Sequence, residues 1–265
     1  MTVLDPVVPA TGWSVLHLTL KVDHTQADPA GEVAVAVRDV LTRWQNEIQL
    51  HVFTAVGHKA DVLLMALDQD LTKLRALQTE IAAAGAPALI LTGSYLSLTE
   101  GSEYTDTPER YREMMEAKGL SGDELERRVE QYAQRMADYT ESKLHPNMPE
   151  WELLCFYPMS HKREGADNWY ALDYEERKRL MGEHGRSGRA YTGRVLQLVS
   201  ASTGLDDYEY AVSLFAHNLA DVKSIVYTMR YDEASVRYAE FGPFVIGIRR
   251  APDELVREIG LGPAR

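Results

Sequence analysis

A tyrosine, a basic run and a histidine in the second half of the chain carry complementary chemistry. Tyr157 lies in a largely apolar segment, the residues 161–163 (His-Lys-Arg) follow it, and His184 comes later among glycines. A phenol can be oxidised, cations bind carboxylates, and a neutral imidazole is a good iron ligand. One half of the protein therefore holds a redox-capable phenol, a basic cluster and a candidate iron ligand.

His184 falls in a segment with helical spacing that begins at Asp173. Leu180, Met181 and His184 share one face of that helix, which the apolar pattern predicts to point inward. The histidine could be a hydrogen-bonded core residue, or a ligand whose second ring nitrogen donates a hydrogen bond. Three nearby glycines each cost about 1 kcal/mol of helix propensity, and their missing side chains would let a flat group approach: Gly182, Gly185 and Gly188.

Tyr157 is predicted to lie on a strand. Alternation places Leu153, Cys155, Tyr157 and Met159 on one face, so ordinary core packing is the alternative to a redox role. Pro158 cannot donate to a ladder and indicates a strand end or edge, where a substrate could reach the phenol.

Gln197 shares a predicted strand face with Val195, Val199 and Ala201. An amide in such a row needs hydrogen-bond partners, which could come from the core or from a bound ligand. The basic run at 161–163 is open to two interpretations as well. It could be a solvated loop, or it could bind carboxylates, because lysine offers a point charge and arginine a planar fork.

Composition limits the function classes. The chain has 265 residues, 45% hydrophobic and 26% charged, with a formal net charge of −12, which argues against a nucleic-acid-binding surface. Its single cysteine, Cys155, excludes an intrachain disulfide and is predicted to be buried. With no apolar run of about 20 residues and no secretory signal pattern, we expect a cytoplasmic protein without a membrane segment.

The periodicity predicts an α+β fold in which one element order occurs twice. Strand, helix, strand, strand, helix, strand are predicted over 13–22, 33–45, 48–56, 60–67, 71–84 and 86–98, and again over 153–159, 173–187, 194–201, 208–215, 219–231 and 241–248. We interpret this as two ferredoxin-like units (βαββαβ twice) that form a dimeric α+β barrel. The predicted domains are a ferredoxin-like domain at 1–104, a helical insertion and connector at 105–150, and a second ferredoxin-like domain at 151–265, which holds the candidate iron ligand His184.

The motifs of the second half resemble the coproheme decarboxylase branch of the chlorite dismutase-like haem proteins. The motifs that carry the resemblance are Tyr157-Pro158-Met159, His184-Gly185, Asp206-Asp207-Tyr208-Glu209, Asp232-Glu233-Ala234-Ser235 and Tyr238-Ala239-Glu240-Phe241-Gly242. The resemblance implies that His184 is the proximal iron ligand, that Tyr157 forms a radical, that Gln197 lies on the distal side and that Ser235 contacts a propionate. The binding residues expected on this basis are Lys143, Tyr157, Met159, His161, Lys162, Gln197 and Ser235.

The implied activity is oxidative decarboxylation of iron coproporphyrin III (coproheme) at propionates 2 and 4 by hydrogen peroxide. The product is haem b, at the last step of a coproporphyrin-dependent haem biosynthesis route, and the substrate acts as its own redox cofactor. The family resemblance also implies a homopentamer, and we expect a transient contact with a coproporphyrin ferrochelatase. A haem-dependent peroxidase and a non-catalytic haem carrier or sensor are the alternatives.

Three positions depart from the pattern of the family. His161 stands where many relatives carry lysine, Lys143 where arginine is common and His145 where tyrosine is common. Charge is kept at Lys143, but the bidentate geometry of arginine is not. The hydrogen-bond partner of His184 is also open, with Glu233 and Glu240 as candidates.

Overall fold

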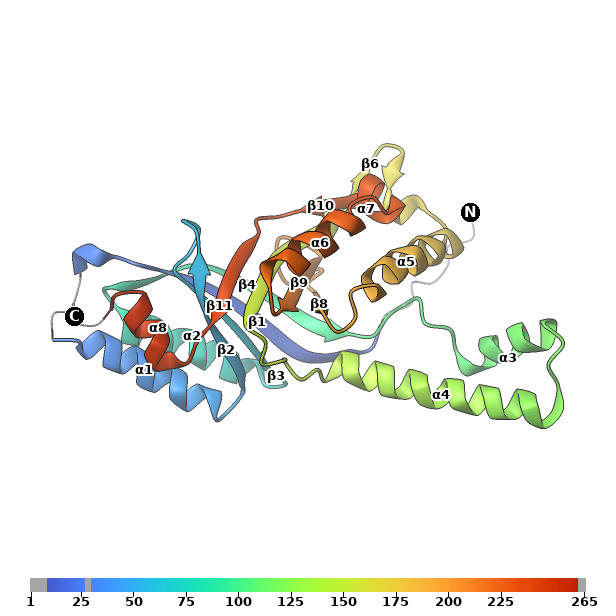
Figure 1. Cartoon of the computed structure of the whole chain (residues 1–265), viewed down its shortest axis with the longest axis horizontal. Coiled ribbons are helices and arrows are strands. Elements are labelled where there is room, and N and C mark those ends of the chain that lie inside the picture. Colours follow the sequence, from blue (N-terminus) through green and yellow to red (C-terminus); the bar gives the residue numbers. More distant parts are fainter. Residues whose placement is uncertain (1–8, 27–29, 262–265) are drawn as a thin grey trace. The chain divides into compact units, whose positions relative to one another are not determined.

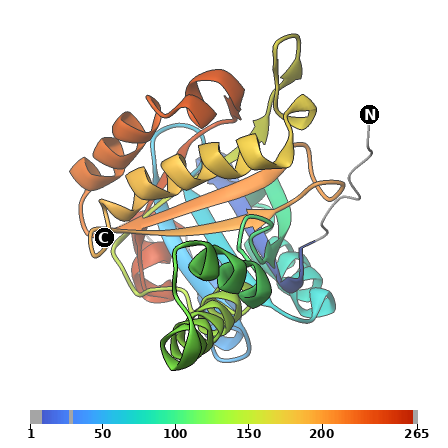
Figure 2. The ribbon, with the colours of Figure 1, turned by 90° about the vertical axis from the view of Figure 1, so that its right-hand side faces the viewer.

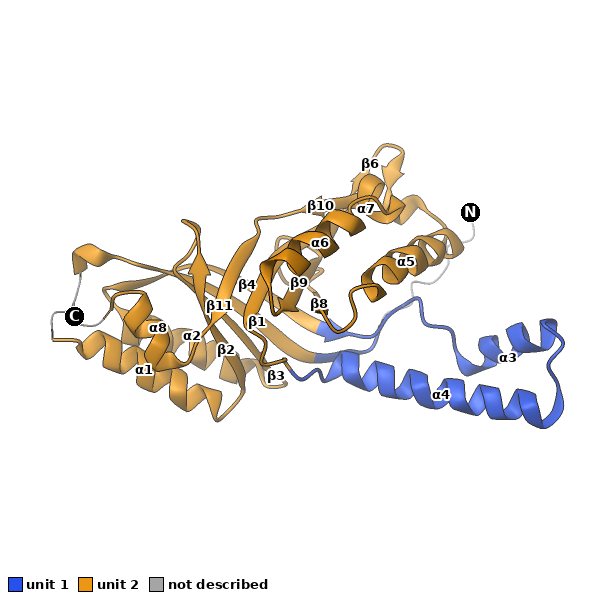
Figure 3. Ribbon diagram, in the orientation of Figure 1, with its two compact units in different colours: residues 1–12, 99–147 blue, residues 13–98, 148–265 orange. Residues whose placement is uncertain are grey.

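The computed structural model describes residues 9–26 and 30–261. The chain divides into two compact units, one of residues 1–12 and 99–147 and the other of residues 13–98 and 148–265 (Figure 3). The two halves predicted from periodicity lie together in the second of these units, so the boundaries at 104 and 150 stay predictions.

The elements of the first half follow the predicted order closely. They are β1 (Thr11–Val22), α1 (Glu32–Gln45), β2 (Gln49–Val56), β3 (Val62–Asp68), α2 (Leu71–Gly85) and β4 (Leu89–Glu100). A short 3-10 turn, η1 (His24–Gln26), follows β1. Asp70 caps α2 by accepting a hydrogen bond from the backbone N–H of Thr72 at 2.8 Å, which fixes where the helix begins.

The second half departs from the prediction near its end. Its main elements are β5 (Leu153–His161), α5 (Tyr174–Arg189), β8 (Val195–Ala201), β9 (Tyr210–Ala216), α6 (Leu219–Met229) and β11 (Val245–Arg249). The predicted helix 219–231 ends at Met229, and a separate α7 (Glu233–Tyr238) follows. The predicted strand 241–248 divides into β10 (Ala239–Phe241) and β11, because Pro243 between them cannot donate to a ladder.

Besides η1 and α7, four further short elements lie outside the segments predicted from periodicity. They are β6 (Arg163–Glu164), β7 (Asp167–Asn168), the 3-10 turn η2 (Trp169–Ala171) and α8 (Pro252–Glu258). The basic run therefore does not form a plain loop: Arg163 pairs with Asn168 in a two-stranded sheet. This hairpin leads directly into η2, which packs beside the end of β5.

Nine strands form one large sheet in the order β10-β5-β11-β2-β3-β1-β4-β8-β9, and an added pairing of β5 with β9 closes it (Figures 1 and 2). The first half contributes the order β2-β3-β1-β4 and the second half the order β11-β5-β9-β8. A large antiparallel sheet with helices, the predicted α+β class, is confirmed. That the halves are duplicated ferredoxin-like units stays a prediction.

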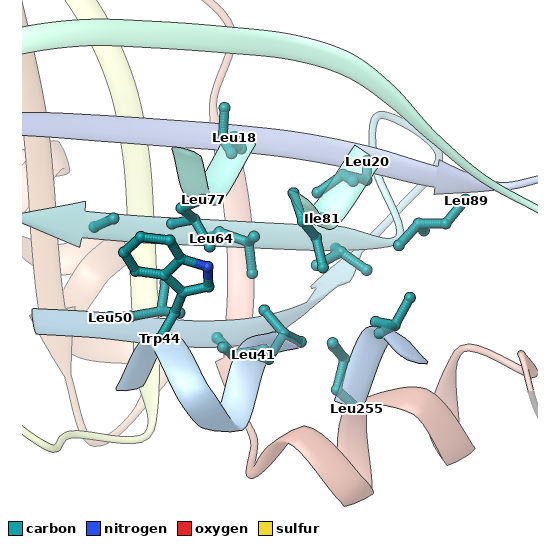
Figure 4. Packing of buried hydrophobic residues seen from close by; sticks show 14 of the residues in the cluster. Leu18, Leu20, Leu41, Trp44, Leu50, Leu64, Leu77, Ile81, Leu89 and Leu255 are labelled. Carbon is teal, nitrogen blue, oxygen red and sulfur yellow. The ribbon is translucent and has the colours of Figure 1, made fainter. Parts of the chain in front are cut away.

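Apolar side chains hold helices to the outside of this sheet. Around the first half, α1, α2 and α8 cover the strands with a cluster that includes Leu41, Trp44, Leu77, Ile81 and Leu255, each at most 4% exposed (Figure 4). Burial of one such side chain stabilises the fold by about 1.5–3 kcal/mol. The closed interior is filled by another cluster, in which Phe53, Met65 and Phe215 are fully buried.

Helices α5, α6 and α7 lie over the second half (Figures 1 and 2). Beneath them is a third cluster that includes Cys155, Tyr157, Val212 and Leu214. Cys155 is 1% exposed, which confirms its predicted burial, and this burial raises the pKa of its thiol to about 12. Side chains cap the first two of these helices: Asp173 accepts from the N–H of Glu176 at 2.8 Å at the start of α5, and Asn218 accepts from the N–H of Asp221 at the start of α6.

The other unit contains a helical hairpin, α3 (Pro108–Ala117) and α4 (Gly122–Leu144), within the region predicted as a helical insertion. Tyr111 and Tyr132 stack across it with ring centroids 4.0 Å apart. Ser121 precedes α4, but its side chain makes no capping hydrogen bond, and the Glu124 carboxylate pairs with Arg128. None of the helices that the structure describes is long and apolar enough to cross a membrane.

Candidate functional site

His184 lies on α5 with one ring nitrogen turned toward a carboxylate. Its Nδ1 is 3.2 Å from Oδ2 of Asp232, the residue before α7, and Asp232 Oδ1 accepts a hydrogen bond from Ser187 at 2.8 Å. Neither His184 Nδ1 nor Asp232 Oδ2 forms a hydrogen bond in the described part of the chain, so the two buried atoms meet as a close pair without hydrogen-bond alignment. The partner of His184 is thus Asp232, and the two predicted candidates, Glu233 and Glu240, are wrong.

The alternatives fail for clear reasons. Glu233 is occupied by Arg179 and Arg237, with N–O distances of 3.0 and 3.1 Å. Glu240 lies on β10, paired with Ser160 of β5. The turn between α6 and α7, absent from the periodicity, is what brings Asp232 against α5.

Burial lowers the pKa of His184, although Asp232 acts in the opposite direction and a charge on His161 would add to the lowering. The imidazole is therefore neutral near pH 7, which is the form that binds a metal. In the tautomer that carries its proton on Nδ1, facing the Asp232 carboxylate, Nε2 keeps its lone pair. Nε2 makes no hydrogen bond to a described residue, and 28% of the side chain is exposed.

The three glycines around His184, which the sequence predicts to leave room for a flat group, differ in what lies beside them, and Gly188 has the closest approach to other side chains. A Cβ there would lie 2.9 Å from Nε2 of Gln197 and 3.6 Å from Cε of Met229. Beside Gly182 there is nothing within 4 Å, and a Cβ on Gly185 would meet only the end of the Arg189 side chain. Gly188 lies one turn after His184, so it brings α5 close to the strand that carries Gln197.

Tyr157 and Gln197 lie on the same, helix-covered side of the sheet. Three strands lie side by side here, with β9 between β5 and β8. Tyr157 of β5 pairs with Val212 of β9, which pairs with Val199 of β8. Two residues along, Cys155 pairs with Leu214, which pairs with Gln197. Directly paired residues share a face. The face predicted for Tyr157 and for Gln197 is thus one continuous surface, on which Val199 remains 37% exposed.

Tyr157 is 8% exposed and is fixed by aromatic neighbours. Its ring stacks on Phe244 with centroids 4.2 Å apart, and the edge of Phe241 lies at 5.8 Å. Burial raises its pKa, so the phenol stays protonated. Its hydroxyl makes no hydrogen bond within the described ranges, which departs from the expectation that a buried tyrosine finds a partner.

His161 ends β5 and, by alternation, lies on the face of Tyr157 and Met159. Its ring is parallel to that of Trp169, with centroids 4.3 Å apart and planes 7° from each other. Its Nδ1 is 3.7 Å from Oε2 of Glu209. Glu209 belongs to one of the motifs quoted above, but the sequence predicts no role for it or for Trp169. The β6–β7 hairpin brings Trp169 to His161 and the register of β9 brings Glu209 there, and neither can be read from the sequence pattern.

The remaining predicted residues occupy different places. Lys162 directly follows β5 and its ammonium group forms no ion pair within the described chain, whereas its backbone N–H donates to Tyr238 at 2.7 Å. Ser235 lies in α7, three residues after Asp232, and Met159 packs beside Tyr157 in the third cluster. Lys143 belongs to the other unit, in the last turn of α4, where its Nζ is 5.6 Å from the ring centroid of Tyr139.

These residues fit an iron porphyrin with acidic side chains. His184 offers a neutral imidazole whose Nδ1 faces the carboxylate of Asp232. Histidines that bind a metal commonly have such a carboxylate beside the nitrogen that does not bind it. Tyr157 has an uncommitted hydroxyl, and Lys162 has an uncommitted ammonium that suits a propionate. Nδ1 of His161 is buried 3.7 Å from Glu209 Oε2, which leaves Nε2 as the ring nitrogen that could face a ligand.

Comparison with known proteins agrees with this geometry. A family model described as chlorite dismutase matches residues 30–250. A coproheme decarboxylase of Oceanobacillus iheyensis is 32% identical over 268 residues, which cover 97% of this chain and 99% of that protein.

Two solved structures extend the comparison. A haem-binding protein from Thermus thermophilus has a TM-score of 0.81 at 31% identity, covering 96% of this chain and 98% of that one. A mutant chlorite dismutase from Candidatus Nitrospira defluvii has a TM-score of 0.71 at 19% identity, covering 94% and 96%, which shows a shared fold. Fold, family model and relatives agree, and the chain belongs to the chlorite dismutase family.

Proposed function

We propose that this protein is a coproheme decarboxylase, which uses hydrogen peroxide to convert propionates 2 and 4 of iron coproporphyrin III to vinyl groups and so yields haem b. The similarity to a coproheme decarboxylase along nearly the whole chain supports the substrate class. A haem-binding relative at 31% identity supports a porphyrin ligand. We further propose a cytoplasmic homopentamer that meets a coproporphyrin ferrochelatase transiently, as the resemblance implies.

The observation that carries the proposal is the pairing of a metal-ready histidine with an uncommitted tyrosine. His184 has its Nδ1 3.2 Å from Asp232, and Tyr157 lies on the sheet face that α5 and α6 cover. A haem carrier needs the histidine but has no use for a buried phenol without a hydrogen bond. A decarboxylase needs both.

Each residue has a task that follows from its surroundings. When bound, the porphyrin iron supplies the oxidising chemistry with peroxide. His184 holds the iron through Nε2 while Asp232 keeps the proton on Nδ1. Tyr157 would lose an electron to the oxidised porphyrin together with its proton, since burial disfavours the phenolate, and would then take a hydrogen atom from the propionate side chain. The propionate would become a vinyl group by losing carbon dioxide and passing a second electron to the porphyrin.

The other side chains bind and orient the substrate. Lys162, His161 and Ser235 are proposed to contact propionates, as is Lys143, which can act as a point charge but not as a fork. Met159 packs beside Tyr157 and would contact the porphyrin edge. Gln197 carries no charge, so it offers a neutral donor on the distal side rather than a site that retains a reactive anion.

The test is a mass-spectrometric assay of purified protein with ferric coproheme and hydrogen peroxide. We expect an intermediate that has lost one carbon dioxide, followed by haem b. Tyr157→Phe should bind coproheme with a normal Soret spectrum and form neither product. Conversion by this variant at the wild-type rate would remove the role of Tyr157. Oxidation of a peroxidase dye without any loss of carbon dioxide would favour a haem peroxidase, and binding without either reaction a carrier.

A further inference from the structure

Glu209, the last residue of the Asp206–Glu209 motif, has no part in the proposed reaction, yet the residue is only 6% exposed and both of its carboxylate oxygens accept hydrogen bonds. Oε2 accepts the backbone N–H of His161 at 2.9 Å, and Oε1 accepts the guanidinium of Arg163, with Nε at 3.2 Å. Burial of a carboxylate is costly unless donors surround it. Here the donors come from the end of β5, from the β6–β7 hairpin and from Tyr170 in η2.

The ring of His161 is held on several sides. One face stacks on Trp169, and Tyr210 approaches edge-on with centroids 5.5 Å apart. Nδ1 is buried 3.7 Å from Glu209 Oε2, without a hydrogen-bond partner in the described ranges. Nε2 is the only other polar atom of a side chain that is 11% exposed. The surrounding side chains therefore prevent the His161 ring from rotating and leave no room for another hydrogen-bond partner at Nδ1.

Resting on the proposed function, we propose that Glu209 is a positioning residue that holds His161 at Nδ1, so that Nε2 binds a propionate carboxylate of the substrate. An imidazole between two carboxylates carries a proton on each nitrogen and donates to both. Arg163 neutralises the second oxygen of Glu209, so the buried carboxylate does not repel the incoming propionate. His161 shares its strand face with Tyr157, which brings this propionate to the residue proposed to react with it.

Metal-free coproporphyrin III is the appropriate probe, because it has the four propionates but forms no bond between iron and His184. Its affinity is measured by fluorescence titration for the wild type, Glu209→Gln and a matched control, Asp207→Asn. The control removes a negative charge from the same loop at an exposed residue. Glu209→Gln should bind about tenfold more weakly, the loss expected when a charge-assisted hydrogen bond is disrupted, and Asp207→Asn should bind normally.

A double-mutant cycle separates positioning from support of the hairpin. If Glu209 acts through His161, then Glu209→Gln should cause no further loss of affinity in a His161→Phe background. An equal tenfold loss in both backgrounds would show that Glu209 serves the fold alone. Unchanged affinity of the single variant would also overturn the proposal.

A measurement on the wild type does not depend on a folded variant. With ¹⁵N-labelled histidine, the ring nitrogens of His161, assigned by their absence in His161→Phe, should both carry protons when coproporphyrin III is bound. An unprotonated Nε2 in the complex would contradict the proposed contact. If the wild type binds the porphyrin but never decarboxylates coproheme, the proposed function fails while the contact stands; if it does not bind, both fail.

Discussion

The contact between His184 and Asp232 makes the sharpest prediction. In Asp232→Asn the side chain keeps its shape and can still accept from Ser187 through its one oxygen. The amide NH2 then faces Nδ1 of His184, where a donor replaces an acceptor. The neutral imidazole must therefore move its proton to Nε2, the atom proposed to bind iron.

The size of the effect follows from the distance. Two full charges 3.2 Å apart at an effective dielectric constant of 20 would interact by about 5 kcal/mol. Burial keeps His184 neutral, so only part of this energy applies. Loss of such a partner typically weakens metal binding by about 10–100-fold, or about 1.4–2.7 kcal/mol.

Titration with ferric coproheme, followed in the Soret band, measures this loss directly. We expect weaker binding and a shift of the iron spectrum in Asp232→Asn, with the metal-free porphyrin bound as tightly as by the wild type. Ser187→Ala is the matched control, because it removes the hydrogen bond to Asp232 but leaves the carboxylate beside His184. Wild-type affinity and spectrum in Asp232→Asn would refute the role given to this pair.

Two further predictions concern stability. Burial alone would raise the pKa of Glu209, but hydrogen bonds from His161, Tyr170 and Arg163 lower it from 4.5 to about 2. Because this pKa is below that of the unfolded chain, the ionised carboxylate should add about 3 kcal/mol to the free energy of unfolding above pH 4.5, and this contribution should be lost toward pH 2. Urea unfolding should show that the wild type is more stable than Glu209→Gln above pH 4.5 and that the difference shrinks toward pH 2. A difference that does not change with pH would contradict this. Gly182→Ala should raise the free energy of unfolding by up to about 1 kcal/mol, because no atom lies near the added Cβ. Gly188→Ala should raise it less or lower it, because the added Cβ meets Gln197. Equal free energies of unfolding for the two variants would count against this packing.

Much of the fold could be predicted from periodicity. Alternation located β5, β8 and β9 within a few residues, and helical spacing located α5, because each pattern reports which side of an element is buried. The break between β10 and β11 was missed although Pro243 marks it. The closure of the sheet by β5 and β9 joins residues such as Tyr157 and Val212, and no local pattern reports such a pairing.

The candidate site was predicted only in part. The faces of Tyr157 and Gln197 follow from alternation and agree with the structure. Asp232 was missed because the direction of its side chain depends on the turn that leads into α7, a helix that the sequence pattern did not predict. Which residues hold the substrate stays a prediction, since a propionate contact depends on side-chain positions that the protein alone does not fix.

Sheet closure also limits how copies of this chain could associate. Strands at open edges can recruit a strand from another molecule, but here β5 and β9 satisfy each other, and in the described chain the large sheet ends in the three-residue β10. Strand addition is thus a poor route to assembly. Self-association, where it occurs, has to depend on complementary side-chain surfaces. Single surface substitutions should therefore be able to dissociate an oligomer into folded protomers.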